Sequence, residues 1–322
     1  MTAGTGEFDL IARIRARVAA RDDVVLGIGD DAAIVQLPPG RQLVVAMDTL
    51  NAGVHFPDGS APAGIGWKSL AVNLSDLAAM AATPAWCTLS LSLPASDPAW
   101  VDGFLDGFLA LAAEHGVALV GGDTTRGPLS VCVAVHGLVA PGRALRRDGA
   151  VAGDDIWVSG TLGDAAAALM QWSAGDAAPD PWLRARLDRP TPRVALGESL
   201  AAIAHAAIDV SDGLLADLGH VCQAGGVGAE IDVDALPASP ALRSLHAGDA
   251  RRRLQATGGD DYELCFAAPM QARAAVARAA AGSGCAVTRV GRIVAGQGVD
   301  ARDATGMPWR ADRSGFDHFG AR

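Results

Sequence analysis

The first half of the chain alternates between segments with a helical hydrophobic period and short segments typical of strands. Apolar residues recur at helical spacing over Glu7–Arg21, whereas Trp86–Leu93 alternates as a half-buried strand does. This pattern predicts helices over Glu7–Arg21, Trp67–Ala82 and Trp100–His115, and strands over Val24–Leu26, Ala32–Val35, Leu43–Ala46, Trp86–Leu93, Val117–Val120 and Ser130–Val139.

The second half repeats this mixture after a change of composition at Ala140–Gly153, where glycines and a proline lie among arginines. Such a stretch is typical of a linker, so we predict one domain over residues 1–145 and another over residues 146–322. Strands and helices in both halves predict an α+β or α/β protein. The second half is predicted to contain helices over Gly163–Trp172, Arg193–Ala206, Leu214–Ala224 and Met270–Ala281, and strands over Asp155–Ser159, Ile208–Val210, Ala229–Val233, Glu263–Ala267 and Ala286–Ile293, followed by an irregular tail.

Composition and charge narrow the class of partner. The net charge is −10 and there is no long basic run, which argues against nucleic acid or an anionic membrane as a partner. The N-terminus lacks the regions of a secretory signal, and no apolar stretch approaches the roughly 20 residues that a membrane span needs. The five cysteines are scattered without a C-x-x-C pair, which favours buried thiols over disulfides or a zinc site. These features predict a cytoplasmic protein.

Aspartates recur in short segments beside glycine or small polar residues, mostly just after strand-like runs. Because Mg²⁺ prefers oxygen ligands and bridges carboxylates to phosphates, these segments suit a site where metal ions hold a nucleotide. Any one Asp-Gly pair is more often a turn, but the recurrence favours the metal site. The segments are GIGDD (27–31), MDT (47–49), NLSD (73–76), GGDTTRG (121–127), IDVSDG (208–213) and GGDDYE (258–263).

Several other features have ordinary interpretations. GIGDDA at 27–32 fits G-x-G-x-x-A, but a short strand-like run follows it instead of a long helix. Lys68 lacks the P-loop spacing and is predicted to be a helix residue. His55, in a loop after Asp48, is equally well an ordinary loop histidine. Asp30 could act as a local turn acceptor, and Asp102, Asp106 and Asp217 are predicted to lie on solvated helix faces.

The acidic segments carry a resemblance to a known family. GIGDDAA, LAVNLSDLAAM (70–80), GGDTTRGP (121–128), IDVSDGL (208–214) and GGDDYEL (258–264) occur in the order seen in the thiamine-monophosphate kinase family, within the superfamily of aminoimidazole ribonucleotide synthetase. The resemblance extends from Gly6 to the GFDHF segment at Gly315. It implies the two-domain α+β fold of that superfamily, ATP as co-substrate, several Mg²⁺ ions, and a homodimer in which the N-terminal domains pair through their sheets.

The resemblance also implies roles for individual residues. The implied magnesium ligands are Asp31, Met47 through its backbone carbonyl, Asp48, Asp76, Asp123, Asp209 and Asp212. The implied ATP contacts are Gly122, Asp123, Arg147 and Ser211, and the implied thiamine-phosphate contacts are His55, Asp260 and Phe316. Asp48, Asp123 and Arg147 would be the catalytic residues.

Three positions depart from the family pattern. Ala46-Met47 precede Asp48 where a small hydroxyl pair is common. Asp260 stands where Glu is common, so the carboxylate reaches less far. Phe316 stands where Tyr or Trp occurs, which keeps an aromatic ring but removes a polar handle.

The activity implied is direct in-line transfer of the ATP γ-phosphoryl group to thiamine monophosphate, giving thiamine diphosphate. Since the second pKa of a phosphate monoester is about 6, the acceptor needs no dedicated base. Two alternatives remain open: another ATP-dependent enzyme of the superfamily, or a non-catalytic protein that binds nucleotide or thiamine phosphate. Selenophosphate synthetases usually have a reactive cysteine near the N-terminus, whereas the first cysteine here is Cys87.

Overall fold

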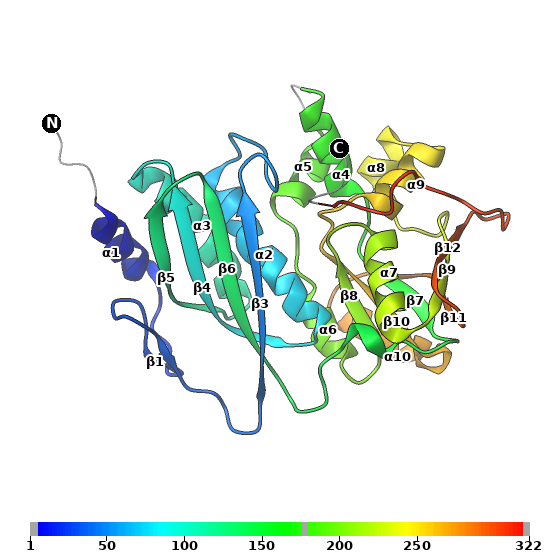
Figure 1. Cartoon of the computed structure of the whole chain (residues 1–322), viewed down its shortest axis with the longest axis horizontal. Coiled ribbons are helices and arrows are strands. Elements are labelled where there is room, and N and C mark those ends of the chain that lie inside the picture. Colours follow the sequence, from blue (N-terminus) through cyan, green and yellow to red (C-terminus); the bar gives the residue numbers. More distant parts are fainter. Residues whose placement is uncertain (1–5, 176–178, 318–322) are drawn as a thin grey trace. The chain divides into compact units, whose positions relative to one another are not determined.

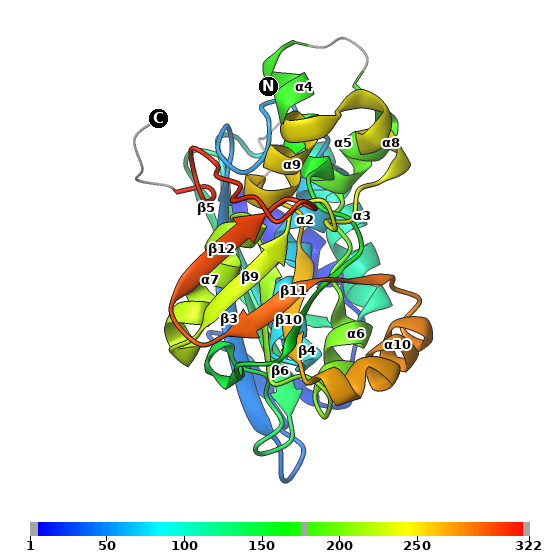
Figure 2. The same cartoon turned by 90° about the vertical axis from the view of Figure 1, so that its right-hand side faces the viewer.

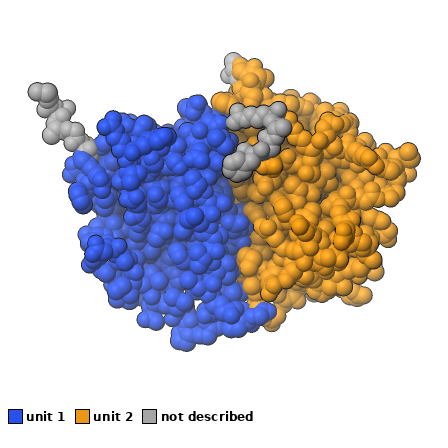
Figure 3. All heavy atoms as spheres, in the orientation of Figure 1, with its two compact units in different colours: residues 1–77, 82–142 blue, residues 78–81, 143–322 orange. Residues whose placement is uncertain are grey.

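The computed structural model describes residues 6–175 and 179–317 and divides into two compact units (Figure 3). Unit 1 comprises residues 1–77 and 82–142, and unit 2 comprises residues 78–81 and 143–322. The predicted boundary after residue 145 stays a prediction, because the contacts define compact units and not independently folding domains. None of the described helices is long and apolar enough to cross a membrane.

Unit 1 is built on a four-stranded sheet in the order β3-β6-β4-β5, with helices α2 and α3 against one face (Figure 1). Strand β3 pairs antiparallel with β6, β6 antiparallel with β4, and β4 parallel with β5. The elements of unit 1 are α1 (Glu7–Arg17), β1 (Val24–Leu26), β2 (Ile34–Val35), β3 (Gln42–Asn51), α2 (Pro62–Ala79), β4 (Thr83–Leu93), α3 (Pro98–Glu114), β5 (Ala118–Arg126) and β6 (Ser130–Val139).

Two glycines allow α2 and α3 to approach closely. A Cβ atom added at Gly66 would lie 2.0 Å from the carbonyl oxygen of Phe104, and one added at Gly107 would lie 1.8 Å from that of Ala63. Real Cβ contacts are never this short, so a larger residue at either position would push the helices apart. Along β6, buried residues alternate with half-buried ones, so the buried side chains all lie on one face of the sheet, the face that these helices cover.

Unit 2 contains a six-stranded sheet in the order β12-β9-β11-β7-β10-β8, part of which faces the viewer in Figure 2. Helix α7 contacts β8, β9 and β12 and covers apolar residues of the sheet. The elements of unit 2 are η1 (Arg147–Gly149), β7 (Asp155–Ser159), α4 (Asp164–Ser173), α5 (Pro181–Asp188), α6 (Val194–Leu200), β8 (Ala206–Val210), α7 (Leu214–Gly225), β9 (Gly228–Asp232), α8 (Pro240–Leu245), α9 (Gly248–Thr257), β10 (Glu263–Ala268), η2 (Met270–Ala272), α10 (Arg273–Gly282), β11 (Val287–Val294) and β12 (Gly298–Arg302).

The structure corrects several predicted elements. Strands β3 and β5 extend beyond the strands predicted at Leu43–Ala46 and Val117–Val120, so Asp48 and Asp123 lie within strands. The predicted tail contains β12, and α5, α8 and α9 were not predicted. Helices α5, α8 and α9 have 8, 6 and 10 residues, and such short helices carry too few residues for a clear hydrophobic period.

Candidate active site

The predicted site residues divide between the two units, and in unit 1 a buried asparagine holds the backbone of one of them, Asp48. Asn73, on α2, accepts a hydrogen bond from the backbone N–H of Asp48 in β3 at 3.0 Å and donates one to the carbonyl of Ser69 at 2.9 Å. Asp76 follows Asn73 by three residues on α2, so their side chains lie on the same face, with roughly 5–6 Å between Cβ atoms. Asp48 and Asp76 therefore flank Asn73. The sequence did not single out Asn73 itself, although it lies in the NLSD segment.

His55 lies in a turn that is held by a buried lysine. The Nζ atom of Lys68, which is only 2% exposed, donates to the carbonyl oxygen of His55 at 2.8 Å. The Nδ1 atom of His55 accepts the backbone N–H of Asn51 at 3.0 Å, so Nδ1 carries no proton. A neutral His55 thus has its hydrogen on Nε2, where the ring can donate to an anion.

Asp48 and Asp123 do not meet within one chain. Asp48 is on β3 and Asp123 on β5, the two edges of the four-stranded sheet (Figure 1). Across the strands, Asp48 pairs with Val133 and Val133 with Leu89, and both of these residues are buried. Asp123 pairs with Ser90, which is exposed. The two carboxylates therefore belong to opposite faces of the sheet. Three strand spacings separate them by roughly 14 Å, far more than the few ångströms between two ligands of one Mg²⁺ ion.

Gly122 occupies a position on β5 that tolerates no side chain. Its φ is 149°, and a Cβ atom there would lie 1.8 Å from the carbonyl oxygen of Leu89 on β4. The glycine before Asp123 is therefore required by the close approach of the two strands.

The remaining predicted ligands of unit 1 are exposed. Asp31 lies in a turn where its own N–H bonds to Oδ1 of Asp30 at 2.8 Å, which makes Asp30 a local turn acceptor. The Met47 side chain is 64% exposed on the outer face of β3. A metal contact through the Met47 carbonyl stays a prediction.

In unit 2 the turn between β8 and α7 brings four predicted site residues together. Its carbonyl groups accept backbone N–H groups from two other segments: Ser211 from Asp260 at 2.8 Å, and Asp212 from Phe316 at 2.9 Å. Glycines permit this contact, since a Cβ atom at Gly259 would lie 2.6 Å from the Ser211 oxygen. The predicted nucleotide and metal residues and the predicted substrate residues of this unit are thus joined through backbone hydrogen bonds.

The segment that carries Asp260 has a strained backbone. Asp260 and Tyr262 have φ angles of 68° and 50°, values that non-glycine residues rarely adopt. The Tyr262 hydroxyl donates to Oδ1 of Asp260 at 3.0 Å, and the Tyr262 N–H bonds to the carbonyl of Val210. These contacts hold the Asp260 carboxylate in one orientation, and such strain is common at functional sites.

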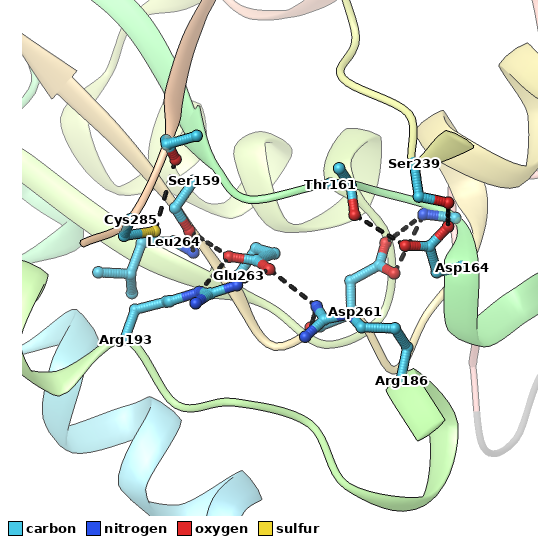
Figure 4. Close-up of polar contacts among 12 residues, drawn as sticks. Ser159, Thr161, Asp164, Arg186, Arg193, Ser239, Asp261, Glu263, Leu264 and Cys285 are labelled. Carbon is cyan, nitrogen blue, oxygen red and sulfur yellow. Dashed lines mark hydrogen bonds and ion pairs between the residues drawn. The ribbon is translucent and has the colours of Figure 1, made fainter. Parts of the chain in front are cut away.

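Buried ionic groups hold the residues that follow Asp260 in the chain (Figure 4). Glu263 is fully buried and accepts hydrogen bonds from Ser159 Oγ at 2.5 Å, Arg193 Nε at 2.6 Å and Arg186 Nη2 at 2.8 Å. Arg186 also donates to the carbonyl oxygen of Asp261 at 3.1 Å. Burial raises the pKa of the Asp261 carboxyl, which accepts the backbone N–H of Gly163, the N-cap residue of α4. The ionic cluster fixes the backbone immediately after Asp260.

Asp217 corrects the prediction of a solvated helix face. It lies in the first turn of α7 but is only 3% exposed, and its Oδ2 atom accepts the N–H groups of Ser211, Asp212 and Gly213, each at 3.1 Å. Burial, with repulsion from Asp209 and Asp212, raises the pKa of Asp217 to about 7. The sequence could not reveal this contact, because a side chain that folds back over its helix terminus has no hydrophobic signature. By contrast, Asp102 and Asp106 do lie toward solvent, in ion pairs with arginines of α1.

Arg147 lies apart from this turn. It opens η1, which contacts the C-terminal end of α7, where Gly225 would place a Cβ atom 3.6 Å from the carbonyl oxygen of Ala150. Ser211 and Asp212 precede the other end of this 12-residue helix, about 18 Å away along its axis. The structure therefore does not place the backbone of Arg147 beside Ser211.

The charge of the β8–α7 turn fits a divalent cation. Asp209 and Asp212 help to raise the pKa of Asp217, which indicates negative charge at this turn that a cation would neutralise. Within residues 6–175 and 179–317, no three His, Cys, Asp or Glu side chains form a ready-made metal cage. Mg²⁺ characteristically uses one or two carboxylates, waters and substrate phosphates instead of such a cage. Asp209 and Asp212 are thus suitable ligands for an ion that arrives with a nucleotide.

Comparison with known proteins finds related domains in both halves of the chain. Residues 29–139 match the N-terminal domain of AIR synthase related proteins, and residues 151–304 match the C-terminal domain. The chain is 48% identical over 322 residues to the thiamine-monophosphate kinase of Salmonella typhimurium, and 46% identical over 319 residues to that of Escherichia coli K12, with 98% of both chains covered in each case.

Solved structures extend the similarity to the fold. The thiamine-monophosphate kinase of Stenotrophomonas maltophilia superposes with a TM-score of 0.86 at 57% identity, covering 93% of this chain and 97% of that one. AaThiL complexed with AMPPCP and TMP superposes with a TM-score of 0.78 at 32% identity, covering 98% and 97%. With both domains matched and nearly the full length aligned, the chain belongs to the thiamine-monophosphate kinase family, with the two-domain α+β fold of AIR synthase related proteins.

Proposed function

We propose that the chain catalyses the ATP-dependent phosphorylation of thiamine monophosphate to thiamine diphosphate, a step of thiamine diphosphate biosynthesis. The observation that carries this proposal is similarity over 98% of the chain to thiamine-monophosphate kinases. The related AaThiL structure holds AMPPCP, an ATP analogue, together with TMP. The acidic segments that carry the resemblance to the family are all present in this sequence, with Met47 and Asp260 as departures from the pattern.

The reaction is a direct in-line transfer of the γ-phosphoryl group. The acceptor phosphate is mostly ionised near neutral pH, so the protein needs to position it and to neutralise charge, and not to remove a proton. Arg147 supplies positive charge to the phosphates, and His55 donates a hydrogen bond from Nε2 to the phosphate of thiamine monophosphate. Asp260, oriented by Tyr262, and the Phe316 ring bind the thiamine portion.

Several Mg²⁺ ions, held by carboxylates of the acidic segments, would offset the repulsion between these segments and the ATP phosphates. The proposed ligands are Asp31, the Met47 carbonyl, Asp48, Asp76, Asp123, Asp209 and Asp212. The proposed ATP contacts are Gly122, Asp123, Arg147 and Ser211. Asp48, Asp123 and Arg147 are the catalytic residues in this scheme.

The enzyme acts as a homodimer that pairs through the sheets of unit 1. Leu43, Val45 and Met47 are 41%, 58% and 64% exposed on the outer face of β3, an unusual apolar row for a solvated strand. Pairing with a second copy would cover this row.

Val45→Glu is expected to convert the dimer into a monomer, because a charge at the centre of the apolar row must be desolvated on pairing. Sedimentation equilibrium would measure the change. Val151→Glu, at a similarly exposed valine in unit 2, is the matched control and should leave the mass unchanged. A wild-type protein that is monomeric at micromolar concentration would contradict the proposal.

The proposed location is the cytoplasm, where ATP and Mg²⁺ are supplied. All five cysteines are free thiols, and four of them are buried, as expected in a reducing compartment. Burial raises the pKa of the thiol groups of Cys87 and Cys265, which keeps them unreactive.

The function is tested by incubating the purified protein with ATP, Mg²⁺ and thiamine monophosphate and following thiamine diphosphate by the fluorescence of its oxidised product. We expect diphosphate formation that stops when EDTA removes the metal. ADP release only with a formylglycinamidine or selenide substrate would assign a sister activity of the superfamily. Tight ATP binding without turnover of any of these substrates would indicate a binding protein.

A further inference from the structure

The β8–α7 turn resembles a phosphate-binding turn in outline but differs from one in a decisive way. A strand, a glycine and a helix N-terminus follow one another at Val210–Leu214, an order that often directs free backbone N–H groups at an anion. Here the N–H groups of Ser211, Asp212 and Gly213 all point to one oxygen of Asp217. A carboxyl oxygen from within the chain therefore occupies the place where a phosphate oxygen would bind.

The carbonyl groups of the same turn are also engaged. Those of Val210, Ser211 and Asp212 accept the N–H groups of Tyr262, Asp260 and Phe316, respectively. With the amides bonded to Asp217 on one side and the carbonyls bonded to two segments on the other, the turn has little freedom to rotate. What it can offer a ligand are the side chains of Ser211 and Asp212 and of the neighbouring Asp209.

We propose that Asp217 is a positioning residue that holds the β8–α7 turn in the form in which Asp209 and Asp212 bind Mg²⁺ and Ser211 binds the nucleotide. Asp217 does so by taking up the three amides that would otherwise be available to phosphate. This inference rests on the proposed function for the identity of the ligands. It adds that the phosphates are held at this turn through side chains and metal, and not through the backbone amides.

Asp217→Ala tests the proposal, because it releases all three amides and leaves a space of about one carboxylate group. The half-saturating Mg²⁺ concentration for turnover should rise about tenfold or more, as is usual when a partner of a metal ligand is removed. The KM for thiamine monophosphate at saturating Mg²⁺ should change much less. Sodium formate should restore part of the Mg²⁺ affinity, since its carboxylate can occupy the vacated space, whereas sodium chloride at equal ionic strength should not.

Two further variants separate positioning from a general loss of structure. Asp217→Asn keeps an acceptor oxygen and should fold like the wild type with a smaller effect on Mg²⁺. Asp154→Ala removes another carboxylate that is 3% exposed and accepts a backbone N–H, that of Val151, but lies before β7, away from the turn. It should lower the melting temperature without changing the Mg²⁺ dependence.

Several outcomes would overturn the proposal. They are a folded Asp217→Ala variant with wild-type Mg²⁺ dependence, an equal change in Asp154→Ala, or no difference between formate and chloride. Calorimetric titration of the wild-type and variant proteins with ATP in the presence of Mg²⁺, without thiamine monophosphate, tests the role of Asp217 independently of the acceptor. A wild-type protein that binds Mg²⁺ and ATP but does not phosphorylate thiamine monophosphate would count against the proposed function alone.

Discussion

Asp48→Asn is expected to lower kcat/KM on the order of 100-fold and to raise the half-saturating Mg²⁺ concentration. The substitution keeps the volume of the side chain and leaves the hydrogen bond between the Asp48 N–H and Asn73 intact, so the fold should persist. It removes the negative charge that a hard cation requires, and the amide is a much weaker ligand. Initial rates at several Mg²⁺ concentrations, with circular dichroism to verify folding, provide the measurement.

The matched control is Asp106→Asn on α3 of the same unit. Asp106 is exposed and pairs with Arg17 on the surface, an interaction that contributes little. This variant should retain wild-type rates and Mg²⁺ dependence. If Asp48→Asn were as active as the control at low Mg²⁺, Asp48 would not be a metal ligand.

Glu263→Gln is expected to have the largest effect on stability, lowering the free energy of unfolding by about 3–5 kcal/mol. Glu263 is completely buried and is the partner of both Arg186 and Arg193. Without its charge, two buried or half-buried guanidinium groups lose their counter-ion, which costs far more than breaking an exposed pair. Chemical denaturation followed by tryptophan fluorescence would measure the change.

Glu230→Gln is the control, since Glu230 pairs with Arg292 at the surface and its loss should cost at most about 1 kcal/mol. Glu263→Gln should also weaken the binding of thiamine monophosphate, because the ionic cluster around Glu263 holds the strained segment that carries Asp260. Equal stability of the two variants would show that the buried cluster does not stabilise unit 2.

The local elements of the fold could be predicted where the sequence carries a clear period. Helix α3 and strand β6 each bury one side, and the matching helical or strand period of apolar residues is visible in the sequence. The ends of β3 and β5 were not visible, because the glycines and aspartates of MDT and GGDTTR have low strand propensity. Pairing with β6 and β4 extends these strands through the aspartates, a tertiary effect that local propensity does not contain.

The candidate site shows the same division. The sequence by itself determined the family, and from the family pattern it predicts the set of acidic residues. Only the tertiary structure decided that Asp48 and Asp123 lie at opposite edges of one sheet, and that Asp217 is buried beneath its turn instead of facing water. The physical reason is that these facts depend on strand order and on contacts between segments distant in sequence, for which no local pattern of polar and apolar residues is sufficient.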